Sequence, residues 1–231
     1  TATVKNIGHT DDEILALANN DSKALSLEEL LYAATLVNDT KKKEEILNIA
    51  AKNFPEDSRA KNNIADLKFK AGKIDEATKI WNDIVSKNPN MAEANMNLGL
   101  SALNSGDLQK AAQYLGKAGN CSEYGEAMGT LLTQQGNYDA ACQSFGDVKS
   151  NNAAVAQICA NNLSKAKSIL DAVKDKDAMT YYLAAIVGAR TNNSNEVSSN
   201  LAKAVSMDSA LKTKAANDLE FSKFASVVAG L

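Results

Sequence analysis

The stretch AGKIDEATKIW, residues 71–81, places a glycine, a small alanine and a large tryptophan close together in the chain. Gly72 can adopt the left-handed backbone conformation that ends a helix. Ala77 follows five residues later and Trp81 four residues after that, so both fall on one face of a second helix. This pattern predicts two helices that cross closely at Ala77, with Trp81 filling the space beside the crossing.

The same pattern recurs twice along the chain, as SGDLQKAAQYL at 105–115 and QGNYDAACQSF at 135–145. Each copy has Gly, then Ala five residues later, then a large apolar residue nine residues after the Gly. The first two copies are 34 residues apart, and so are the only two prolines, Pro55 and Pro89. An apolar segment of helical period precedes each glycine, so the repeating unit is a helix, a turn and a second helix.

These units resemble the tetratricopeptide repeat family. The resemblance implies an all-α fold, a right-handed α-solenoid of about six helix–turn–helix repeats closed by a C-terminal capping helix. We expect an N-terminal lead-in segment and capping helix at 1–23, the repeat solenoid at 24–211, and a capping helix and tail at 212–231. In the phase of the opening stretch the six units are 24–57, 58–91, 92–121, 122–146, 147–177 and 178–211.

Two signals predict where the first helices begin. Thr10 and Ser26 each precede a glutamate by three residues, the spacing of a capping box. The first helix of the fifth unit, around 153–160, has only a weak apolar pattern.

The composition narrows the function classes. The net charge is −3, so the chain offers no general attraction for nucleic acid. No apolar run approaches the roughly 18–20 residues of a membrane span. With one histidine, His9, and no phosphate-binding glycine loop, we predict no enzyme activity, no cofactor and no metal site. We expect Cys142 and Cys159 to be small core residues.

The family resemblance implies that the first helices line the inner face of the stack, where a protein or peptide would bind. The residues so predicted are Arg59, Asn62, Asn63, Asp66, Phe69, Lys70, Met96, Asn97 and Leu100. The same projection continues to Glu123, Glu126, Tyr182 and Arg190. Arg59 and the asparagines partly echo the carboxylate clamp of some family members, but the next repeat has Glu123 where a basic residue is needed. For Met96 and Leu100 the alternative is ordinary packing between repeats.

The preferred hypothesis is a non-catalytic scaffold that presents a concave groove to a protein or peptide. The alternative is a structural spacer or oligomerisation segment of a larger cell-envelope protein. The chain also resembles the C-terminal repeat region of exported proteins of gut Gram-negative bacteria, which implies a periplasmic or outer-membrane-associated location; the alternative is the cytoplasm. The absence of an initial Met favours a processed or partial chain. The oligomeric state stays open.

Overall fold

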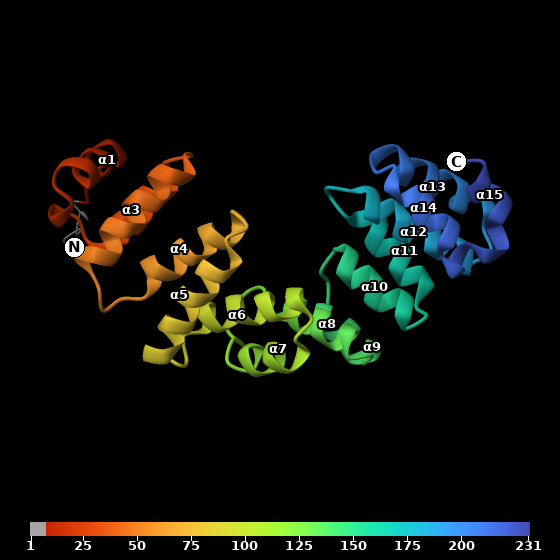
Figure 1. The fold of residues 1–231 in the computed structure, drawn as a ribbon, viewed down its shortest axis with the longest axis horizontal. Coiled ribbons are helices and arrows are strands. Elements are labelled where there is room, and N and C mark those ends of the chain that lie inside the picture. Colours follow the sequence, from red (N-terminus) through yellow and green to blue (C-terminus); the bar gives the residue numbers. More distant parts are fainter. Residues whose placement is uncertain (1–7) are drawn as a thin grey trace, which may run out of the picture. The chain divides into compact units, whose positions relative to one another are not determined.

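The computed structural model describes residues 8–231, which form 15 α-helices and two short 3₁₀ helices and contain no strand (Figure 1). The all-α prediction is therefore confirmed. The helices group into two compact units, one made of residues 8–101 with 116–121 and the other of residues 102–115 with 122–231. Residues 1–7 of the expected lead-in segment lie outside the described residues.

The first unit is built from two packed helix pairs and their N-terminal cover. α2 packs on α3, α4 packs on α5, and α1 packs on α2. The predicted capping boxes begin helices, since the side chains of Thr10 and Ser26 accept hydrogen bonds from the amides of Glu13 and Glu29. The elements are α1 (Asp11–Asn20), η1 (Ser22–Ala24), α2 (Leu27–Leu36), α3 (Thr40–Asn53), α4 (Arg59–Lys70), α5 (Ile74–Lys87) and most of α6 (Ala92–Ser105).

The second unit continues the pattern with α8 on α9, α10 on α11 and α12 on α13. The weakly patterned first helix of the fifth unit is formed, as α10. The segment 212–231, expected as a capping helix and tail, contains the end of α14, η2 and α15. The elements are α7 (Leu108–Leu115), α8 (Tyr124–Gln134), α9 (Tyr138–Phe145), α10 (Asn151–Cys159), α11 (Leu163–Ala172), α12 (Ala178–Arg190), α13 (Ser194–Met207), α14 (Ala210–Asn217), η2 (Leu219–Phe224) and α15 (Ala225–Ala229).

Five turns between first and second helices share one geometry. Each contains a residue with positive φ, and the next amide donates to the carbonyl five residues earlier, as in a Schellman motif. Gly72 and Lys73 show it clearly, with the Lys73 amide 2.8 Å from the Lys68 carbonyl oxygen. The residues with positive φ are Gly72, Gly106, Gly136, Asn161 and Asn192. The last two were not predicted, and asparagine is the residue that best replaces glycine in this conformation.

The predicted close crossings are formed by buried small residues. Ala77, Ala111, Ala141 and Ala166 have no exposed surface. The sixth pair has the larger Val197 at this position, and the facing helix compensates with Gly188. A Cβ atom on Gly188 would lie 2.9 Å from the Cβ of Glu196 and 3.2 Å from the Val197 nitrogen. In the other pairs, a small alanine on the second helix lets the two helices approach closely. In the last pair, a glycine on the first helix does so instead.

Candidate functional site

The predicted binding residues lie on two first helices of the first unit, α4 and α6. Arg59, Asn62, Asn63, Asp66, Phe69 and Lys70 lie on α4, and Met96, Asn97 and Leu100 lie on α6. The two groups meet at one point, where the Asn97 side-chain amide donates to Asn62 Oδ1 at 3.2 Å. Whether these nine residues bind a partner stays a prediction.

Two of the nine are packing residues. Asn62 is only 9% exposed, and its Oδ1 also accepts a hydrogen bond of 3.0 Å from Trp81 Nε1. Met96 is 3% exposed. Burial removes both side chains from the accessible surface, so their structural role is to join α4 to α5 and to fill the core. For Met96 the packing alternative is the one that the structure supports.

Arg59 is exposed but already engaged by the chain itself. Its guanidinium contacts Asp57 at 3.1 Å and Glu28 of α2 at 3.1 Å. Hydrogen bonds from Arg59 hold the pKa of the Asp57 carboxyl below its usual range. The pKa of the Glu28 carboxyl is also lowered, first by a backbone hydrogen bond and then by Arg59. The three groups together carry one net negative charge, so Arg59 is not a free donor for an acidic partner.

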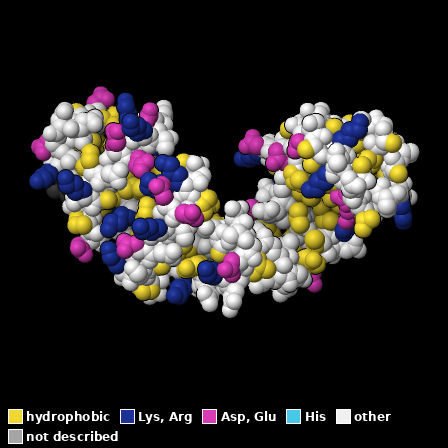
Figure 2. Space-filling view, in the orientation of Figure 1, with side chains coloured by type: hydrophobic (Ala, Val, Ile, Leu, Met, Phe, Trp, Pro, Cys, Tyr) yellow, Lys and Arg dark blue, Asp and Glu magenta, His cyan; other side chains and the backbone are white. Residues whose placement is uncertain are grey.

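The accessible part of the predicted surface is therefore smaller, and we call it the α4 face: Asn63, Asp66, Phe69 and Lys70. Lys70 pairs with Asp66 at 2.7 Å, and its side chain is 71% exposed. Phe69 is half-buried and packs on Trp81, with 5.7 Å between ring centroids. Basic and acidic side chains are interspersed over α3 to α5 on the side drawn in Figure 2. The α4 face thus combines charged tips with part of an aromatic ring.

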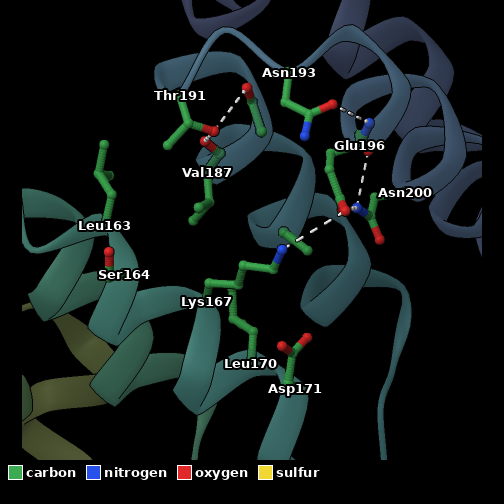
Figure 3. A pocket seen from close by; sticks show the side chains of 12 residues that line it. Leu163, Ser164, Lys167, Leu170, Asp171, Val187, Thr191, Asn193, Glu196 and Asn200 are labelled. Carbon is green, nitrogen blue, oxygen red and sulfur yellow. Dashed lines mark hydrogen bonds and ion pairs between the residues drawn. The ribbon is translucent and has the colours of Figure 1, made fainter.

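A pocket in the second unit was not predicted from the sequence. It has a volume of about 280 Å³ and lies between α11, α12 and α13 (Figure 3). Leu170, Val187 and Gly188 supply apolar surface. At its edge Lys167 Nζ lies 3.7 Å from a Glu196 carboxylate oxygen. This ion pair is solvent-exposed, so it contributes at most about 1 kcal/mol.

The polar groups around this pocket are largely satisfied by their neighbours. Asn200 donates to the Glu196 carboxylate at 3.0 Å, and the Asn193 side chain caps α13 through the Glu196 amide. Thr191 donates to the Val187 carbonyl at 2.8 Å. The signal in the sequence that could have found the pocket is the small residue Gly188 within the apolar α12. A ligand in this pocket would find a shaped apolar surface but few free hydrogen-bonding groups.

The cysteines differ from the sequence prediction. Cys159 is exposed, so the expectation of a core role was wrong for it, while Cys142 is half-buried. Burial raises the pKa of the Cys142 thiol. Cys159 is the last residue of α10, where a helix end meets solvent. Among residues 8–231 no group of three or more His, Cys, Asp or Glu side chains is arranged to hold a metal ion.

Comparisons with known proteins agree with this architecture. Residues 62–122 match the tetratricopeptide repeat family. No significant match is found among curated proteins. Of the helices in the described part of the chain, none has both the length and the apolar character needed to cross a membrane.

Three solved structures illustrate the similarity of fold. A tetratricopeptide repeat protein from Parabacteroides merdae is 16% identical, with a TM-score of 0.60 over 95% of this chain and 91% of that one. PilF of Pseudomonas aeruginosa is 14% identical, with a TM-score of 0.58 over 94% and 96%. A chain of the APC/C hetero-tetramer Cut9–Hcn1 is 13% identical, with a TM-score of 0.70 over 94% of this chain but only 46% of that one. At these identities the likeness concerns the fold.

Proposed function

We propose that this chain, whose residues 62–122 match the tetratricopeptide repeat family, is a non-catalytic scaffold that binds a protein or peptide partner. Such repeats generally mediate protein–protein interactions. The observation that carries the proposal is the α4 face, which lies within the matched repeats and leaves Asn63 and Lys70 exposed. The partner that this face fits is an extended segment with both polar and apolar side chains.

The contacts around the α4 face refine what such a segment needs. Lys70 and Asp66 pair with each other on the surface, so either can be redirected to a partner at small cost. Phe69 offers part of its ring beside them, held in place by Trp81. A segment that carries one charged and one apolar side chain a few residues apart would use both features.

The test is a double variant on the α4 face, Asn63→Ala with Lys70→Ala. Neither side chain is buried, so we expect helicity and melting temperature to be nearly unchanged. Proteins captured from the native source by the unaltered chain should be lost, and binding of the purified partner should weaken about tenfold or more, equivalent to ~1.4 kcal/mol.

The matched control is Lys79→Ala, an exposed lysine on α5 of the same helix pair. It should leave capture intact. Equal binding by the double variant and the unaltered chain would show that the α4 face is not the binding surface. If no partner were captured at all, the better function would be the spacer or oligomerisation segment of a larger protein. The periplasmic or outer-membrane location stays a prediction, tested by fractionating the native cells.

A further inference from the structure

The turn residues with positive φ are equivalent points in the helix pairs, so residues of different first helices can be matched by counting back from them. Asn62 and Lys70 stand ten and two residues before Gly72, the left-handed residue that ends their helix pair's first helix. Tyr182 and Arg190 stand ten and two residues before Asn192, which has the same role in the last pair. Arg190 therefore corresponds to Lys70 of the α4 face, and Tyr182 corresponds to Asn62, the buried residue beside that face. Together they mark the equivalent surface of α12.

In the last pair this surface is covered by the chain itself. We call residues 218–224 the strap; they comprise Asp218 and the 3₁₀ helix η2. The Tyr182 hydroxyl donates to Asp218 at 2.6 Å, and the Phe221 ring meets the Tyr182 ring edge-on with centroids 5.5 Å apart. The Arg190 guanidinium donates to both oxygens of the Glu220 carboxylate, its Nε lying 3.0 and 3.2 Å from them. Tyr182 is left only 1% exposed.

Within the strap, the residues that contact α12 flank one residue that points to solvent. Asp218, Glu220 and Phe221 face α12, whereas Leu219 between them is 87% exposed. A 3₁₀ helix of six residues has weak internal hydrogen bonding, so side-chain contacts fix where the strap lies. A guanidinium holding a carboxylate by two hydrogen bonds and a hydroxyl donating to a second carboxylate distinguish an acidic sequence from a neutral one.

Neighbouring charges strengthen this selectivity. The Lys214 ammonium lies 5.3 Å from the centre of the Tyr182 ring, the same ring that Phe221 of the strap contacts. Arg190 also donates to the Ile158 carbonyl of α10 at 3.0 Å, which fixes the guanidinium in position for Glu220. A donor group held in place by a neighbouring helix is typical of a preformed binding site.

We propose that the strap is an internal ligand: it occupies the binding face of the last helix pair, and α12 recognises its acidic–aromatic sequence Asp218-Leu219-Glu220-Phe221. The face is therefore closed to other proteins in the intact chain. It opens when the strap is released, and it then accepts a segment with the same acidic and aromatic groups. This inference goes beyond the proposed function, because it concerns another face whose occupant is the chain itself, and a failure of binding at the α4 face leaves it intact.

The experiment weakens the strap in the full chain and supplies the same sequence as a separate peptide. In the variant Asp218→Ala with Glu220→Ala, hydrogen exchange should accelerate at residues 218–224 while the amides of α12 stay protected. A fluorescent peptide of residues 216–224, ANDLEFSKF, should bind this variant at least tenfold more tightly than the unaltered chain. The milder variant Glu220→Gln should show the same local acceleration to a smaller degree.

Charge reversal then tests recognition rather than general loosening. Adding Arg190→Glu to the double variant should abolish peptide binding, and a peptide with Glu220→Arg should restore it. Lys223→Ala, an exposed strap residue, is the matched control and should leave the face closed. Failure of the opened variant to bind the peptide, or failure of the reversed pair to rescue binding, would overturn the proposal. Global unfolding of both variants, or a strap that stays protected in both, would show that it is a fixed part of the core and would overturn it equally.

Discussion

A single side chain, Trp81, joins the features that define the α4–α5 pair. Its ring is buried at 1% exposure and packs against Phe69, while its Nε1 donates to Asn62. Asn62 in turn accepts from Asn97 of α6. The asparagine predicted to contact a partner is thus the acceptor that allows a tryptophan N–H to be buried without losing its hydrogen bond.

Truncating this side chain should remove more stability than any surface change nearby. Trp81→Ala deletes a buried aromatic ring and leaves a cavity, so we expect the free energy of unfolding to fall by about 3–5 kcal/mol. Urea unfolding followed by circular dichroism measures it. Lys79→Ala, on the exposed side of α5, should change the same quantity by less than about 0.5 kcal/mol. Equal effects of the two changes would show that Trp81 is not at the centre of this pair.

At the scale of an element, the N-terminus of α12 is capped by one carboxylate, that of Asp177. Asp177 accepts the Thr180 amide at 2.9 Å, and Thr180 Oγ1 accepts the Asp177 amide at 3.1 Å, which completes a capping box. Asn151 of α10 donates to the same carboxylate at 3.1 Å, so the cap also links two first helices. The sequence does not predict this cap, because a capping box is recognised by glutamate or glutamine at the third helical position, where this chain has threonine.

Because of the Asp177 cap, the free energy of unfolding should depend on pH in the acid range. The backbone hydrogen bond from Thr180 is the main cause that holds the pKa of the Asp177 carboxyl below its ordinary value of 3.8. A lowered pKa in the folded state means that the charged cap stabilises the fold above about pH 4, and that this contribution is lost as pH falls through the folded pKa. Asp177→Ala should cost about 0.5–2 kcal/mol near neutral pH.

The informative control is Asp177→Asn, which keeps an oxygen acceptor but cannot titrate. Urea unfolding measured from about pH 6 down to about pH 2.5 should show a smaller loss of stability for Asp177→Asn than for the unaltered chain. If both proteins lost stability in parallel, Asp177 would not contribute to the acid dependence.

At the scale of the whole molecule, the sequence predicts the repeat more securely than the surface. The 34-residue spacing of Ala77 and Ala111 requires recurring close crossings, and these are formed. Helical periodicity cannot separate a groove residue from one that packs against the next repeat, which is why the sequence leaves both roles open for Met96. The pairing of Arg59 with Glu28 depends on residues 31 positions apart, and no local pattern contains it.

Helix pairs that contact mainly their chain neighbours should also lose stability locally. In the first unit α4 packs on α3 and α5, and in the second α12 packs on α10, α11, α13 and η2. Stability in such a stack is close to a sum of nearest-neighbour terms, so a defect weakens the surrounding pairs most. We therefore expect Trp81→Ala to accelerate hydrogen exchange in α4 and α5 by at least about tenfold, with much less change in α12 and α13. Leu201→Ala, a fully buried residue of α13, is the mirror variant and should give the opposite pattern. Uniform acceleration along the chain by either variant would mean that both units unfold as one cooperative body.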